Sequence, residues 1–268
     1  MRSGAFNKPS FFGVDTLSKI EKVQTGIPGL DEMLYGGLPK GRVILLVGGP
    51  GTGKTIFTTQ FLIYGIRELG ENGIFVSLDE SKKHYMTEMN SFGWDLENLE
   101  KEKKWRFIDA SPIKEESESE TGKITIGNKD FSMSNLIEEI QNKAKEINAQ
   151  RIIVDPLTSL VFHYPESIKR RSAVLKLIDA LTKTNATSMV TTELKTSGLE
   201  RNIVLEEYLS HGVVILQTLH IGKESTRAFR IEKMRGTPID PKIRPYRITE
   251  NGIEIYPQES VFYGVGEA

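Results

Sequence analysis

The stretch Gly48-Gly49-Pro50-Gly51-Thr52-Gly53-Lys54-Thr55 decides how the chain folds. It fits the pattern Gly-x-x-x-x-Gly-Lys-Thr, which cradles the phosphates of a nucleotide. Glycines allow positive φ, so that successive backbone N–H groups point inward at an anion. Lys54 supplies a cation for the β- and γ-phosphates, and the Thr55 hydroxyl is a hard oxygen ligand for Mg²⁺. The predicted nucleotide-binding residues of the loop are Gly49, Pro50, Gly51, Thr52, Gly53, Lys54 and Thr55.

The residues on either side of the loop support this interpretation. Residues 42–47 form a nearly all-apolar run, which is typical of a buried parallel strand. Residues 56–69 carry apolar side chains roughly at helical spacing. The loop therefore joins a strand to a helix, and the N-terminus of a helix is itself a site for anions.

The composition describes a soluble globular protein. Of the 268 residues, 38% are hydrophobic and 26% are charged, the formal net charge is −1, and there is no cysteine. Disulfides and thiolate metal sites are therefore excluded, and no bulk positive field attracts nucleic acid. No apolar run approaches the roughly 20 residues that cross a bilayer, and the N-terminus lacks a secretory layout. We expect a cytoplasmic protein with no membrane partner.

Strands and helices alternate along most of the chain, which predicts an α/β fold with a central, mostly parallel sheet flanked by helices. The last part changes to short strands and predicts an antiparallel β extension of the same sheet. Asn251-Gly252 is a hairpin turn signal between the last two strands. Residues 112–130 are rich in turn residues and predict a loop. The expected strands cover residues 42–47, 73–78, 105–110, 151–155, 187–191, 213–218, 226–232, 246–248 and 253–256.

Acidic side chains follow two of the parallel strands. In open α/β sheets the ligand lies beyond the carboxyl ends of the strands, so these ends should meet near the phosphate loop. Asp155 ends an apolar strand and is the natural partner of Thr55 in holding Mg²⁺; the alternative is a cap for the following turn. Asp79 and Glu80 end a neighbouring strand, where a carboxylate can orient and deprotonate the attacking water. Their alternative role is to cap the helix after Ser81.

Two further groups of residues are candidates on weaker grounds. Thr192 and Glu193, which follow Thr191 at the end of the fifth strand, are placed to sense the γ-phosphate, unless they only form a turn. Lys233 and Arg235 lie on one face of a late strand by alternation. Such a pair could neutralise charge on a γ-phosphate in a neighbouring subunit, where an arginine finger is worth about 10³–10⁵ in rate. The alternative is a solvated edge strand.

Further matches in the same order along the chain carry a resemblance to the RecA-type ATPases, and among them to the KaiC-like group. The resemblance covers residues 20–257, between an N-terminal arm over 1–19 and a C-terminal tail over 258–268. It implies a RecA-like P-loop fold. The matching stretches are residues 25–31, 48–55, 75–81, 92–96, 109–112, 155–160, 191–193, 213–216 and 233–237.

The resemblance also implies cofactors, an assembly and roles. Proteins of this group bind ATP and Mg²⁺ between the subunits of hexameric rings, so a homo-oligomer is expected. The acidic pair would be catalytic. In the circadian-clock ATPase of this group both acids are glutamates, and Asp79 is one methylene shorter than the first of them. Lys233 and Arg235 match residues that cross the interface to the γ-phosphate. Ser91 would contact base or ribose, and so would two residues across the interface, Thr249 and Glu250.

The group also contains autokinases, in which adjacent Ser and Thr residues are phosphorylated. Glu207 and Tyr208 stand at those positions here, so autokinase activity is not expected at that site. The leading hypothesis is a Mg²⁺-dependent ATP-binding protein and slow ATPase that regulates an unknown protein partner.

Two alternatives stay open. One is a RecA/RadA-paralogue-like protein that binds single-stranded DNA through the cluster Lys169-Arg170-Arg171 and the loop after Glu193. The balanced charge does not favour this nucleic-acid function. The other is an ATP sensor that does not hydrolyse its nucleotide, which the shorter side chain of Asp79 allows.

Overall fold

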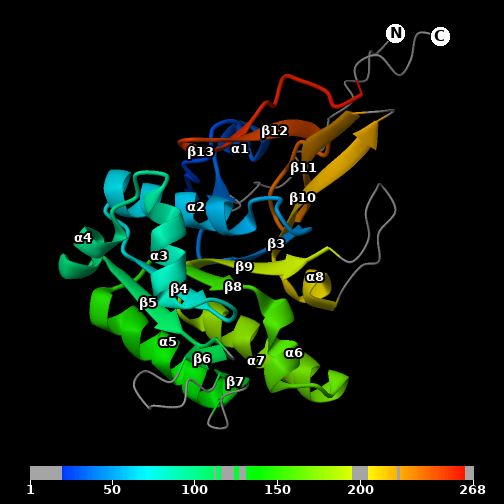
Figure 1. Ribbon diagram of the computed structural model, residues 1–268. Coiled ribbons are helices and arrows are strands. Elements are labelled where there is room, and N and C mark those ends of the chain that lie inside the picture. The colour runs from blue at the N-terminus through cyan, green and yellow to red at the C-terminus, as the bar shows by residue number, and fades with distance from the viewer. Residues whose placement is uncertain are drawn as a thin grey trace, which may run out of the picture.

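A nine-stranded sheet forms the centre of the computed structural model, which describes residues 20–111, 113–115, 124–126, 131–194, 205–221 and 224–262. The strand order is β13-β12-β11-β10-β3-β9-β8-β4-β5 (Figure 1). The expected arm over 1–19 lies outside the described residues. The nine strands are β3 (Val43–Gly48), β4 (Gly73–Ser77), β5 (Trp105–Asp109), β8 (Arg151–Asp155), β9 (Thr187–Glu193), β10 (Gly212–Ile221), β11 (Glu224–Met234), β12 (Arg244–Thr249) and β13 (Gly252–Ile255).

The pairing within this sheet confirms the predicted fold class. Strands β10, β3, β9, β8, β4 and β5 run parallel to one another. Strands β10 to β13 form an antiparallel meander that extends the sheet beyond β3. Because the six parallel strands share a direction, their carboxyl ends lie on one edge, where the phosphate loop follows β3.

Helices cover both faces of the sheet (Figure 1). Side chains alternate along β3, so that Ile44 and Leu46 join the core under α2 and α3, whereas Val43, Leu45 and Val47 join the core under α5 and α7. No helix within the described ranges has the length and hydropathy of a membrane span. The helices are α1 (Leu30–Met33), α2 (Lys54–Glu68), α3 (Lys82–Asn90), α4 (Leu96–Lys101), α5 (Met133–Ile147), α6 (Leu160–His163), α7 (Ser167–Lys183) and α8 (Leu205–Leu209).

The structure differs from the expected elements in three places. A small hairpin of β6 (Ile113–Glu115) and β7 (Ile124–Ile126) lies within the region predicted as a loop. Strands β10 and β11 are 10 and 11 residues long, longer than predicted, because they pair with each other along their whole length. In the last hairpin Thr249 pairs with Gly252, so the turn is one residue earlier than predicted and Gly252, with φ of 113°, begins β13. Further short elements are β1 (Lys22–Val23), β2 (Leu38–Pro39) and the 3₁₀ turn η1 (Leu157–Ser159).

A fully buried arginine fixes α2 on the sheet. Arg151, the first residue of β8, has no exposed surface. Its Nε donates to Glu71 Oε2 at 2.7 Å, Nη1 to the Phe61 carbonyl at 2.5 Å and Nη2 to the Gln24 carbonyl at 2.9 Å. Gly65 of α2 leaves room for it, since a Cβ at that position would lie 2.1 Å from Arg151 Nε. The guanidinium therefore connects the strand, the helix behind the phosphate loop and the chain before α1.

Replacing Arg151 with alanine is expected to lower the free energy of unfolding by about 3–5 kcal/mol, because Glu71 and two carbonyl groups lose a buried partner. Urea unfolding followed by circular dichroism measures this. Lys183→Ala is the matched control, since its side chain is 69% exposed in the ion pair with Asp179 and such pairs contribute only about 0.3–0.5 kcal/mol. Equal losses in the two variants would contradict the role given to Arg151.

Candidate functional site

The phosphate loop occupies the carboxyl end of β3 and the N-terminus of α2, as predicted. Gly51 and Gly53 have φ of 70° and 88°, values that side chains rarely adopt. Lys54 Nζ donates to the carbonyls of Gly48 and Gly49 at 3.0 and 3.1 Å, so its ammonium lies over the loop. Burial lowers the pKa of Lys54. The loop thus presents a positive charge and helix N–H groups to one point in space.

Asp155 lies beside this loop with both carboxylate oxygens engaged. Its Oδ2 accepts from Thr55 Oγ1 at 2.7 Å, and its Oδ1 accepts from Thr191 Oγ1. The side chain is 6% exposed, and burial raises the pKa of Asp155, while the hydrogen bonds from Thr191 and Thr55 oppose that shift. The structure therefore brings together Thr55 and Asp155, which the sequence had placed in one site from positions 100 residues apart.

Oxygen ligands of this kind fit Mg²⁺. Mg²⁺ keeps several waters and takes one or two protein oxygens together with phosphate oxygens. Thr55 and Asp155 supply a hydroxyl and a carboxylate next to a loop built for phosphates. Within the part of the chain that the structure describes, no group of three or more His, Cys, Asp or Glu side chains could hold a metal ion. The donors that are present suit a cation shared with a nucleotide.

The acidic pair lies at the end of β4, next to β8. Ser77 of β4 pairs with Asp155. The Ser77 hydroxyl accepts from Glu80 N–H at 3.0 Å and donates to the Glu80 carbonyl at 2.7 Å, which fixes the turn. Glu80 is half-buried, and burial together with the negative charges of Glu88, Asp155 and Asp79 raises the pKa of Glu80 to about 7. Asp79 is exposed, so Glu80 is the more buried member of the pair, and the charges of both acids interact with that of Asp155.

The end of β9 places Thr191, rather than Thr192, next to Asp155. Alternation places Thr191 and Glu193 on one face of the sheet and Thr192 on the other. Thr191 is the hydroxyl that reaches Asp155, and the charge of Glu193 acts on Lys54. Thr192 is buried on the opposite face. The predicted sensor Thr192 therefore lies on the face of the sheet away from Asp155, whereas Glu193 faces the phosphate loop.

A cavity of about 350 Å³ adjoins the loop. The N-terminus of α2 forms one wall, the second half of α3 forms another, and Ile248 of β12 closes a third side. Ser91, the predicted base or ribose contact, lines it, and its hydroxyl donates to the Glu88 carbonyl at 2.6 Å. Phe92 and Ile56 add apolar surface. The cavity is thus polar at the phosphate end and apolar along one side, which suits a nucleoside.

The hairpin of β12 and β13 packs on the phosphate loop of its own chain. Tyr246 Oη donates to the Thr52 carbonyl at 2.7 Å, and a Cβ on Gly53 would lie 2.9 Å from Ile248 Cδ1. Thr249 and Glu250 follow Ile248 directly. They therefore follow a residue that packs on the loop of the same chain, and their contact with a nucleotide across an interface stays a prediction.

Two residues that hold this hairpin in place were missed from the sequence. Gln60 of α2 accepts from Ile253 N–H at 2.7 Å and donates to the Ile253 carbonyl at 3.2 Å. Tyr246 is the second. A glutamine next to the apolar residues Phe61, Leu62 and Ile63 was the available signal for Gln60. Tyr246 gave no local signal, because its partner is 194 positions away.

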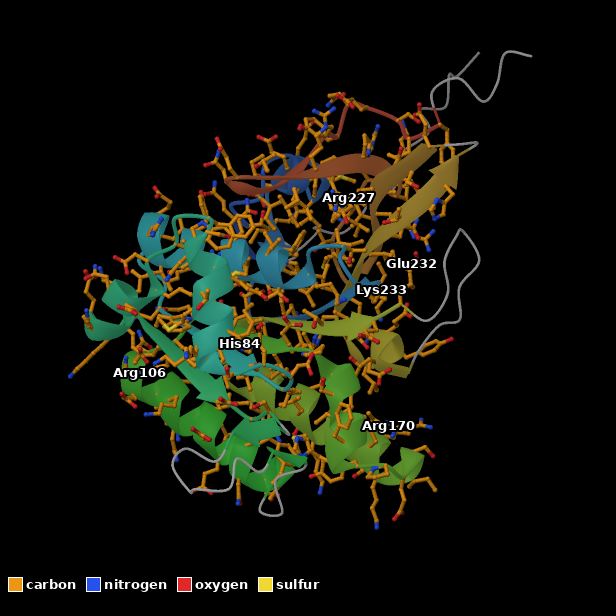
Figure 2. The ribbon with its side chains drawn as sticks, viewed as in Figure 1. His84, Arg106, Arg170, Arg227, Glu232 and Lys233 are labelled. Carbon is orange, nitrogen blue, oxygen red and sulfur yellow. The ribbon has the colours of Figure 1, made fainter. Side chains whose placement is uncertain are left out.

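Lys233 and Arg235 lie away from the loop of their own chain. Val213 pairs with both Lys233 and Leu45. Lys233 is therefore level with a residue three positions before the loop, about 10 Å along the strand. Lys233 Nζ donates to the Glu207 carbonyl, and Arg235 Nη2 donates to the Tyr208 carbonyl at 2.8 Å (Figure 2 labels Lys233). Within one chain, neither cation belongs to the site around Lys54.

Comparisons with known proteins agree with this geometry. The family model described as "ATPase: KaiC" matches residues 23–260. A UPF0273 protein of Pyrococcus furiosus is 35% identical over 90% of this chain and 96% of its own length. A circadian clock oscillator protein KaiC of Picosynechococcus is 36% identical over 94% of this chain. The chain spans about half the length of such clock proteins, 47% in this case.

The crystal structure of a KaiC-like protein from the hyperthermophilic archaeon Pyrococcus horikoshii also matches. It covers 89% of this chain and 100% of that chain, with a TM-score of 0.76 and 36% sequence identity. The family model covers most of the chain. This chain belongs to the KaiC family of ATPases.

Proposed function

We propose that this protein binds Mg·ATP at the loop between Gly48 and Thr55 and hydrolyses it slowly. The observation that carries the proposal is the hydrogen bond of 2.7 Å between Thr55 and Asp155, beside the ammonium of Lys54. The carboxylate is buried at the carboxyl edge of the sheet, where the strand before the loop ends. Burying a charged group there has a cost, which a bound cation would offset.

Residues at different positions of the site have different roles. The loop amides and Lys54 bind the β- and γ-phosphates. Thr55 and Asp155 would hold Mg²⁺, which neutralises charge on the phosphate oxygens when it is bound. Glu80 accepts a proton from the attacking water, because a carboxylate with a pKa of about 7 is a usable base at neutral pH. This assignment gives the base role to the longer of the two acids and leaves Asp79 to support it.

A second subunit completes the site in this proposal. Lys233 and Arg235 are too far along the sheet to serve their own loop, and both side chains come from the end of β11. In a homo-oligomeric ring, which we propose is a hexamer, they would approach the γ-phosphate of a neighbour. Nucleotide bound at these shared sites then determines the conformation of the ring. A protein partner in the cytoplasm binds according to that conformation.

The DNA-binding alternative finds less support. In the cluster proposed to contact single strands, Lys169 Nζ lies 2.8 Å from Glu166 Oε1. Arg170 Nη1 donates to the carbonyls of Tyr164 and Pro165 at 2.9 and 3.1 Å, at the end of α6 (Figure 2). Two of the three basic side chains of the cluster therefore contact other residues of the same chain, which favours a structural role over DNA binding.

Lys54→Ala is expected to abolish ATP binding, because the phosphates lose the cation that faces them. Fluorescence titration with a labelled ATP and a phosphate-release assay on the same sample measure binding and turnover. Lys183→Ala, a lysine at the far end of α7, should leave both unchanged. Unchanged turnover in Lys54→Ala would exclude the loop as the site. Tight binding by the wild type without phosphate release would favour the sensor alternative.

Glu80→Gln is expected to stop phosphate release while ATP still binds, because an amide cannot take the proton. The wild type should lose turnover as the pH falls through about 7, where Glu80 becomes protonated. The pKa of Glu80 is higher in the folded chain than its ordinary value. Above pH 7 the charged carboxylate therefore destabilises the folded chain. At low pH the group is protonated in both the folded and the unfolded chain, so it has no effect on stability. Glu80→Gln should therefore raise the Tm at pH 8 and leave it unchanged at pH 4. Turnover that does not depend on pH between 5.5 and 8 would count against this base.

Arg235→Ala is expected to spare ATP binding but lower turnover, by as much as about 10³-fold if it acts as an arginine finger. Mixing this variant with Lys54→Ala tests whether the site is shared. The first supplies an intact loop and the second an intact Arg235, so mixed rings should regain part of the activity. A mixture no more active than its components, although light scattering shows mixed assemblies, would oppose the shared site.

A further inference from the structure

The aromatic cluster next to the candidate site contains one buried hydroxyl. Tyr85 of α3 has no exposed surface, and its ring centroid lies 4.2 Å from that of Phe75, 5.3 Å from Phe107 and 6.2 Å from Trp105. Its Oη lies 2.9 Å from Thr59 Oγ1 of α2, in a buried hydrogen bond. A phenylalanine would fill the same space without burying a hydroxyl, which costs free energy unless it is paired. The oxygen of Tyr85 therefore needs an explanation beyond packing.

The two partners of this hydrogen bond lead to the two halves of the site. Thr59 is four residues after Thr55, and residues at this spacing share one face of a helix. Tyr85 lies in the first turn of α3, where its N–H donates to the Ser81 carbonyl at 3.1 Å. Ser81 caps this helix and directly follows Glu80. The bond therefore connects the face of α2 that binds Asp155 with the turn that carries the acid.

This contact is a buried side-chain hydrogen bond between α2 and α3. The first residues of α2 and the last turn of α3 both line the cavity of about 350 Å³. Among the described residues, no other side-chain hydrogen bond joins α2 to α3. Burial, together with the charges of Asp155 and Glu80, raises the pKa of Tyr85 well above its ordinary value, so the hydroxyl keeps its proton and lies near both carboxylates. The hydrogen bond between Tyr85 and Thr59 therefore adds to the bonds of Ser77 in fixing the position of Glu80 relative to α2.

We propose that Tyr85 is a positioning residue, whose hydrogen bond to Thr59 holds Glu80 in place over the metal-binding end of α2. The inference rests on the proposed function, since positioning matters only if Glu80 acts on a water at this site. Small displacements of a catalytic group are costly: a shift of about 1 Å can lower a rate by about 10²-fold. Tyr85 acts through Glu80 and does not itself touch the nucleotide.

Tyr85→Phe removes the hydroxyl and keeps the ring in its cluster, and Thr59→Val removes the same bond from the other side. Each variant is expected to lower kcat for ATP at least about 10-fold, while KM stays within about twofold, because only the transition state loses an interaction. The acid limb of the pH profile should move to lower pH as Glu80 becomes less buried. The double variant should be no slower than either single variant, since both changes delete one bond.

Tyr64→Phe is the matched control. Tyr64 is also on α2 and its Oη donates to Gln24 Oε1 at 2.9 Å, away from the cavity. It should keep the kcat and the pH profile of the wild type. If Tyr85→Phe and Thr59→Val lower only the Tm, with kcat and pH profile unchanged at a temperature where all variants are folded, the role of Tyr85 is structural and the inference is wrong.

Hydrogen exchange provides a readout that does not need turnover. In Tyr85→Phe, peptides over residues 78–91 should exchange faster, while peptides over 105–109, which hold Trp105 and Phe107, should be unchanged. Equal exchange over 78–91 in wild type and variant would overturn the inference. If the wild type releases no phosphate, the proposed function fails separately, and the exchange result alone decides whether Tyr85 holds the turn of Glu80.

Discussion

The buried carboxylate of Asp155 is the group on which the site depends. Hydrogen bonds from Thr55 and Thr191 reach its two oxygens from a helix and from a neighbouring strand. A charge in this position is tolerated only when its surroundings are polar and fixed. The parallel sheet supplies these polar, fixed surroundings, because β8 and β9 end, and the loop after β3 begins, along one of its edges. The sheet thereby fixes where the proposed cation and phosphates would meet the acid that follows β4.

Much of this site could be predicted because its signals are local. The loop from Gly48 to Thr55 is one continuous motif, and Asp155 and Glu80 each follow an apolar run that predicts a strand. Because parallel strands end at one edge of the sheet, acids that are distant in the sequence can be placed together without knowledge of any contact. The α/β class and the antiparallel extension could be predicted as well, since both follow from the order of the predicted strands and helices along the chain.

Other parts could not be predicted, because they depend on pairing between remote segments. The choice of Thr191 over Thr192 requires the register of β9 against β8, and a shift of one residue reverses the face of every side chain. The packing of the last hairpin on its own loop, through Tyr246, is a contact that no local pattern shows. The hydroxyl of Tyr85 is hidden in the same way, since an aromatic residue in a helix predicts only a place in the core.

The last hairpin has a consequence for how the molecule is made. The loop near Gly53 emerges early during translation, yet Ile248, Tyr246 and Ile253, which shape its surroundings, are near the end of the described residues. Strand β10, the immediate neighbour of β3, also arrives late. A nascent chain released before this hairpin would carry the complete phosphate motif and still have an unfinished pocket. The surroundings of the loop are therefore completed only after the last strands of the domain have been synthesised.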